Sequence, residues 1–238
     1  MQRSTIVSII ISLLTLASGL SGQEPPNASM IDEFGYLNCE DILVRTFHLA
    51  TEIHNDPGTT VAIIIFSPNK QPGQAEARRH LISSTLQLQS VERDRFNFFS
   101  GGPSPDGEIR IQFWKQPLGA SPPAGDSAAW NEPPHNISRP FMYGYSDETD
   151  ICPTFVPKAF AQLLAANPGA RGKVLVTMGN GAIVNKYSYA AEWIRTLVEV
   201  NGIPRKRLRL VFSKGAETGV EFWFVPARKD RRRRAAYH

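Results

Sequence analysis

The stretch Asn-Pro-Gly-Ala-Arg-Gly-Lys-Val-Leu-Val-Thr-Met, residues 167–178, decides the fold because its pattern occurs twice. Residues 55–66, Asn-Asp-Pro-Gly-Thr-Thr-Val-Ala-Ile-Ile-Ile-Phe, show the same turn followed by the same kind of apolar run. A Pro-Gly pair ends a helix, and a continuous β-branched run is typical of a buried central strand. Each copy therefore predicts a helix, a turn and a buried strand, in that order.

Three further blocks repeat around this stretch in the same order, at an offset of about 110 residues. They pair residues 34–36 (Phe-Gly-Tyr) with 143–145 (Tyr-Gly-Tyr), residues 95–99 with 207–211, and residues 113–117 with 222–226. Order and spacing together indicate an internal duplication. We name the copies repeat 1, residues 30–117, and repeat 2, residues 141–227.

Both repeats predict the element order β-α-β-α-β-β, a two-layer α+β sandwich with helices over a small mixed sheet, which places the chain in the α/β class. In repeat 1 we expect strands near 34–36, 61–66, 95–99 and 108–114, and helices over 40–54 and 74–88. Asn38 and Asp41 have the spacing of an N-terminal helix cap. Helical spacing predicts four core stripes: Ile42, Thr46, Leu49, Ala50, Ile53; Leu81, Ile82, Thr85, Leu88; Val156, Phe160, Leu163, Leu164; and Tyr189, Trp193, Leu197, Val200.

The two ends of the chain and the segment between the repeats have distinct compositions. Residues 1–22 pair Arg3 with an apolar run and then small residues, the pattern of a cleaved secretory signal, with an uncleaved anchor as the alternative. Residues 118–140 are rich in proline and read as a linker, with Trp130 expected to pack onto a domain. We expect an exported protein, periplasmic or secreted.

The net charge of +4 is concentrated in the tail, residues 228–238. Six basic side chains lie there, against the single acid Asp230: Arg228, Lys229, Arg231, Arg232, Arg233 and Arg234. The rest of the chain sums to −1, so we expect basic character to belong to the tail and not to a domain surface. Such a run is usually a solvated end, and it can also attach to anionic lipid or lipopolysaccharide. Export argues against a nucleic-acid partner.

The element order, the repeat size and the export signal resemble the C-terminal OmpA-like domain of the bacterial envelope, present here as two degenerate copies. The clearest matching stretches are Leu-Leu-Ala-Ala-Asn-Pro at 163–168 and Val-Asn-Gly-Ile-Pro-Arg-Lys-Arg-Leu at 200–208. The chain is also similar to uncharacterised exported bacterial proteins with an Asp-Glu-Phe-Gly start, here residues 32–35.

This resemblance implies a peptidoglycan ligand, held by an aspartate after the second strand and an arginine in the second helix. In repeat 1 Asn69 stands in the place of the aspartate, and Arg78 and Arg79 match the arginine-bearing helix. Repeat 2 has neither, since Arg195 comes a turn too late. Arg78 and Arg79 have the alternative interpretation of solvated helix residues.

No catalytic motif, cofactor motif or metal-ligand spacing is found, so we expect a non-catalytic protein with no cofactor. Cys39 and Cys152 are the only cysteines, and an even pair in an exported protein is compatible with one disulfide. Aromatic residues of the strands, Phe96, Phe98, Phe99, Phe113 and Trp114, could stack bases but more often form a core. The leading hypothesis is an envelope binding or scaffolding protein with weak peptidoglycan contact. The alternative is a protein–protein interaction module attached through its basic tail.

Overall fold

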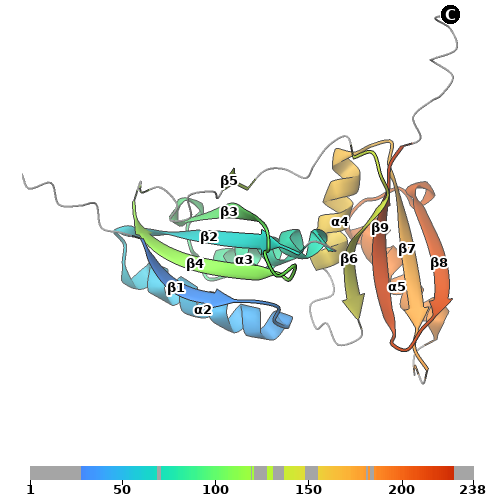
Figure 1. The fold of residues 1–238 in the computed structure, drawn as a ribbon, viewed down its shortest axis with the longest axis horizontal. Helices are drawn as coiled ribbons and strands as arrows, with labels where there is room; N and C mark the ends of the chain where they lie inside the picture. The colour runs from blue at the N-terminus through green and yellow to red at the C-terminus, as the bar shows by residue number, and fades with distance from the viewer. Residues whose placement is uncertain are drawn as a thin grey trace, which may run out of the picture.

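The computed structural model describes residues 28–68, 71–118, 120, 128–130, 137–147, 155–180, 182 and 185–227. Both repeats have the predicted element order, and in each the helices cover one face of a mixed sheet (Figure 1). Repeat 1 contains β1 (Ser29–Phe34), α2 (Cys39–Asn55), β2 (Thr59–Ser67), α3 (Gly73–Leu88), η2 (Arg93–Arg95), β3 (Phe96–Pro103) and β4 (Arg110–Pro117). Repeat 2 contains β6 (Phe141–Asp147), α4 (Phe155–Ala166), β7 (Arg171–Met178), α5 (Lys186–Arg195), η3 (Thr196–Val200), η4 (Arg205–Arg207), β8 (Leu208–Lys214) and β9 (Gly219–Val225).

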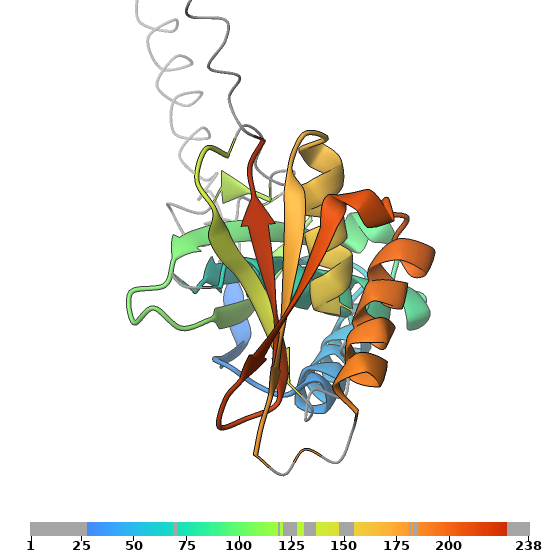
Figure 2. The ribbon, with the colours of Figure 1, turned by 90° about the vertical axis from the view of Figure 1, so that its right-hand side faces the viewer.

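The two sheets have the same topology. Their strand orders are β1-β4-β2-β3 in repeat 1 and β6-β9-β7-β8 in repeat 2, and β5 (Ala128–Ala129) extends the first sheet beyond β3. In each sheet the second and third strands of the repeat pair in parallel, and the other pairs are antiparallel. Figure 2 shows α4 and α5 on the same side of the second sheet. The predicted two-layer α+β architecture is confirmed.

Strand register corrects two of the four predicted block pairs. In the apolar strand Ala62, not Val61, corresponds to Lys173, because Ala62 pairs with Trp114 as Lys173 pairs with Trp223. The first block is shifted further. Met30 pairs with Trp114 and Met142 pairs with Trp223, so Met30 and Met142 occupy the same position. Both first strands have an irregularity directly after this residue. By this register Phe34 corresponds to Ser146, not to Tyr143 as predicted. The motif match was wrong because Gly35 and Tyr36 follow the end of β1, whereas residues 143–145 lie inside β6. Both strands carry the same irregularity, so it does not shift one against the other. The first strand also lies earlier than predicted, over residues 29–34.

The helix caps and core stripes follow the prediction except at two helix ends. Asn38 caps α2 by accepting a hydrogen bond from the Asp41 N–H at 2.8 Å. Leu88 and Val200 are 80% and 76% exposed, although both were predicted in the core. Each is the last residue of its helical segment, and the chain then turns so that Val91 and Ile203 pack beneath the helix end instead. The backbone N–H groups of Val91 and Ile203 bond back to Leu86 O and Leu197 O.

The linker contains a short strand, although its proline content predicted no regular structure there. Strand β5 within it pairs with β3, and the Trp130 N–H donates to Phe98 O at 3.1 Å. The predicted packing of Trp130 onto a domain is confirmed, since its ring packs against the repeat-1 core. Of the five strand aromatics, Phe96, Phe98 and Phe113 are buried in the core, whereas Phe99 and Trp114 are half-buried.

The two repeats pack directly on one another. Helix α3 of repeat 1 lies against α4 and β6 of repeat 2, and Ala77 of α3 is part of the repeat-2 core. Gly73, the first residue of α3, approaches Tyr143 so closely that an added Cβ would lie 2.4 Å from the tyrosine ring. Gln74 Nε2 donates to Tyr145 O at 3.0 Å across the same contact. This contact places the start of α3, where the arginines were predicted to bind a ligand, at the junction of the repeats.

Candidate functional site

A cavity of about 380 Å³ opens at one end of the repeat-1 sheet. Three loops and the start of a helix meet there: the β1–α2 loop, the β2–α3 loop, the β3–β4 loop and the first turn of α3. The lining residues are Tyr36, Pro68, Gln71, Gln74, Asp106, Gly107, Glu108 and Ile109. A volume of this size is suited to a small ligand or to one end of a larger one.

The acidic side of the cavity comes from the β3–β4 loop. Asp106 Oδ1 accepts hydrogen bonds from Ser104 Oγ at 2.6 Å and from the Glu108 N–H at 3.0 Å. These hydrogen bonds, that of Ser104 foremost, lower the pKa of Asp106, so the group stays ionised. Glu108 is exposed on the same loop. The loop therefore presents two carboxylates at the rim of the cavity.

Arg78 is buried behind the opposite wall of the cavity. Only 7% of the residue is exposed, and its Nη2 donates to Leu37 O at 3.0 Å. Its guanidinium lies 5.5 Å from the centroid of the Tyr36 ring, and that ring lines the cavity. The interpretation of Arg78 as a solvated helix residue is wrong. Its positive charge supports the tyrosine from behind.

Arg79 takes part in a different group of side chains, at the junction of the repeats. Its Nε and Nη2 donate to Glu76 Oε1 at 3.0 and 2.6 Å, so Arg79 is not a solvated residue either. Trp130 Nε1 donates to Glu76 Oε2 at 2.7 Å. His80 Nε2 lies 3.2 Å from Glu76 Oε1 and 2.6 Å from Gln162 Oε1 of α4. We call Glu76, Arg79, His80, Trp130 and Gln162 the junction cluster.

The junction cluster keeps a buried carboxylate ionised. Burial alone would raise the pKa of Glu76, but the hydrogen bonds from His80 and Arg79 outweigh it and bring the pKa to about 2. Burial also raises the pKa of Tyr143, which packs beside this cluster, so its hydroxyl stays protonated. The cluster thus joins α3, the linker and α4 through one fixed charge.

Several predicted site residues lie outside the described residues. These are Asn69, Cys152 and the tail residues Arg228, Lys229, Arg231, Arg232, Arg233 and Arg234. Cys39 is described: it is buried at the start of α2 and disulfide-bonded. The structure therefore brings Arg78 to the cavity and Arg79 to the junction, which separates two neighbours that were predicted to act together.

Sequence reasoning missed the residues that shape both sites. Asp106 and Glu108 lie in a turn whose glycine, Gly107, has φ of 80°, and no role was predicted for this turn. The Asp-Gly-Glu run at 106–108 was the available signal. Gln162 gives no signal, because a glutamine in an apolar helix is ordinarily solvent-facing. Only the packing of α4 on α3 brings it to His80.

Comparisons with protein-family models and with curated proteins find no match to this chain. Within the described ranges, no group of three His, Cys, Asp or Glu side chains could hold a metal ion. No helix among those residues is long and apolar enough to cross a membrane.

Proposed function

We propose that the protein is an exported, non-catalytic envelope module in which repeat 1 binds a small group that carries an ammonium ion, such as the diamino-acid end of a peptidoglycan stem peptide. The observation that supports this proposal is the repeat-1 cavity, with carboxylates on its rim and an arginine-backed tyrosine on its wall. Repeat 2 acts as the support on which α3 is held.

The chemistry of the cavity fits such a ligand. A ligand ammonium group meets Asp106 and Glu108, and charge-assisted hydrogen bonds of this kind are about twice as strong as neutral ones. Gln71 Nε2 and Gln74 Oε1 offer neutral polar contacts to a peptide backbone, whereas Gln74 Nε2 already donates to Tyr145 O and Gln71 Oε1. The carboxylates that meet the ligand therefore come from the β3–β4 loop, and not from the position of Asn69, where the resemblance placed an aspartate. The ligand is thus the one predicted from sequence, whereas the residues that bind it are different.

Co-sedimentation of the exported protein with isolated peptidoglycan tests this proposal. We expect Glu108→Gln to weaken binding about tenfold, since one charge-assisted contact contributes on the order of 1.5 kcal/mol. Repeat 2 has a glutamate at the matching chain position, which provides a control. Glu217 is exposed two residues before β9, as Glu108 is two residues before β4, so Glu217→Gln removes the same charge from repeat 2.

Equal binding by the wild type and Glu108→Gln would contradict the proposal, as would equal losses in both variants. Arg79→Ala is a poor probe of the cavity. It removes the main ion pair of Glu76 and so disturbs the junction of the repeats whether or not a ligand binds.

A further inference from the structure

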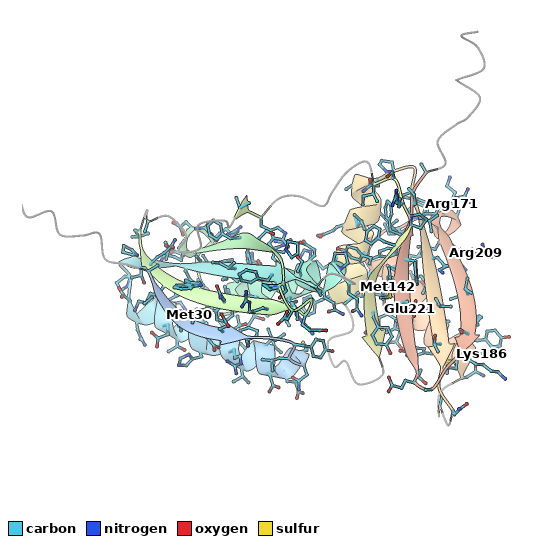
Figure 3. All side chains as sticks on the ribbon, in the orientation of Figure 1. Met30, Met142, Arg171, Lys186, Arg209 and Glu221 are labelled. Atoms are coloured by element: carbon cyan, nitrogen blue, oxygen red, sulfur yellow. The ribbon has the colours of Figure 1, made fainter. Side chains whose placement is uncertain are left out.

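The outer face of the repeat-2 sheet carries three basic side chains. Val174, Val176, Phe222 and Phe224 point into the core beneath the helices, so the alternate residues of β7 and β9 point the other way. Arg171 and Lys173 of β7 lie on this outer side, and Arg209 of β8 pairs directly with Lys173. Figure 3 shows Arg171 and Arg209 on this sheet, together with Glu221 and Met142. We call Arg171, Lys173 and Arg209 the basic face.

The charges of the basic face have no ion-pair partner among the described residues. None of the three side chains forms an ion pair or a hydrogen bond with another of the described residues. Arg171 and Arg209 are exposed, and Lys173 Nζ lies 4.3 Å from the centroid of the Trp223 ring. Glu221 is the carboxylate on the same side, and its Oε2 accepts a hydrogen bond from Trp223 Nε1 at 2.6 Å. The face is therefore a basic surface beside a tryptophan.

Repeat 1 carries no such surface at the same register positions. Trp114 corresponds to Trp223, and its cross-strand neighbour is Ala62, which in turn pairs with Asn97. Thr60 occupies the position of Arg171. Ala62 and Ile64 are fully buried on that side. The two repeats therefore differ on this face in two ways: repeat 2 has three basic side chains there, and its β7 positions are exposed or half-buried where those of β2 are buried.

The basic face adjoins the point from which the tail departs. Arg171 pairs with Val225, the last residue of β9, and the sequence reaches Arg228 three residues later. Contrary to our prediction, basic charge is thus not confined to the tail. Residues 141–227 hold ten Lys and Arg against seven Asp and Glu, whereas residues 30–117 hold eight against eleven.

From this arrangement we infer that the outer face of the repeat-2 sheet is a docking surface for a bilayer that carries anionic phospholipid headgroups. Arg171 and Lys173 are neighbours on one face of β7, and Arg209 lies beside Lys173 on β8, so the three cations are close enough to meet neighbouring phosphates together. Each Lys or Arg near an anionic membrane contributes on the order of 1 kcal/mol to attachment. Tryptophan is favoured at the membrane–water boundary. This inference does not depend on the cavity of repeat 1.

Vesicle sedimentation with the exported chain, tail intact, tests the inference. Vesicles of phosphatidylcholine with about 30 mol% phosphatidylglycerol are compared with neutral vesicles, which report any charge-independent binding. In the test variant the basic face receives the residues of repeat 1: Arg171→Thr, Lys173→Ala and Arg209→Asn. We expect binding to anionic vesicles to fall about a hundredfold, at about fivefold for each charge.

The control variant removes three exposed charges elsewhere in repeat 2, by Arg195→Gln, Lys206→Gln and Lys214→Gln. We expect it to retain most of the binding, since these residues lie off the basic face. If the triple variant does not fold, Arg209→Asn alone, at an exposed strand position, replaces it as the test variant. We expect this single substitution to weaken vesicle binding about fivefold. Equal losses in both triple variants would show that only net charge matters and would overturn the inference. Binding to soluble polyphosphate but not to vesicles would overturn it too, and would assign the face to a polyanionic polymer.

Discussion

At the scale of single residues, Glu76 is the most constrained charge that the structure describes. It is 8% exposed, and donors from two segments converge on its two oxygens: Arg79 and His80 of α3, and Trp130 of the linker. A buried carboxylate without such donors would lose its charge or destabilise the fold. Glu76 therefore stabilises the junction only as long as it remains ionised.

This requirement predicts acid sensitivity. The pKa of Glu76 is about 2 in the folded protein, against 4.5 for a free glutamate. Its contribution to stability is therefore complete above about pH 4.5 and is lost as the pH falls toward 2. We expect a loss of about 3 kcal/mol from the free energy of unfolding over this range. Urea unfolding at several pH values measures it. Glu76→Gln should flatten the dependence of the unfolding free energy on pH. Glu92→Gln, at an exposed position, should leave this dependence unchanged. The same pH dependence in both variants would contradict the role of Glu76.

At the scale of elements, one arginine in each repeat holds a helix end and a strand start together. Arg95 donates to the carbonyl oxygens of Ile53, Asp56 and Thr59. Arg207 donates to those of Leu164, Asn167 and Ala170, the corresponding residues of repeat 2. Arginine suits this position because its planar fork can donate to three acceptors at once, which a lysine ammonium on a flexible stem does less well.

We expect Arg207→Lys to destabilise the protein almost as much as Arg207→Ala, by about 2 kcal/mol, because the charge is kept but most of the three hydrogen bonds are lost. Arg95→Lys should behave alike in repeat 1. Thermal or urea unfolding measures both, with the exposed Lys206→Ala as the reference substitution. Full stability in the lysine variants would show that charge alone is required at these positions.

Most elements were predictable from sequence because their determinants are local. Pro-Gly turns, helical spacing and β-branched runs specified the helices and central strands, and the Asn38 cap was recognised from two residues. The errors at Leu88 and Val200 have one cause, since the following turn brings another residue beneath the helix end. The misaligned first block has another, since a three-residue motif of two aromatic residues around a glycine is too short to fix the alignment of two strands.

At the scale of the whole molecule, the repeats are joined through non-equivalent elements. Helix α3 of repeat 1 contacts α4 of repeat 2, but α3 corresponds to α5 and α4 corresponds to α2 in the element order. The contact is therefore head-to-tail and not two-fold symmetric. This arrangement places the cavity and the basic face on different repeats, so that substitutions can alter one surface without changing the other.

We expect the disulfide of Cys39 to be formed with Cys152, the other cysteine of the chain, and so to link α2 of repeat 1 to the segment before α4. A cross-link across so long a stretch of chain stabilises by about 2–5 kcal/mol, so reduction should lower the unfolding midpoint. Peptide mapping with and without reductant identifies the bond. Two free thiols by titration, with unchanged electrophoretic migration on reduction, would contradict this prediction.

The sequence by itself determined the duplication, the element order and the core, because hydrophobic periodicity and turn residues act over a few positions along the chain. Tertiary structure alone decided that Arg78 backs a cavity while Arg79 pairs with Glu76. It also decided that Gln162 meets His80, and that Arg171, Lys173 and Arg209 share the outer face of the repeat-2 sheet. These relations join residues that are distant in sequence, or separate neighbours on one helix. Only the packing of α3 on α4 and the register of the strands specify them.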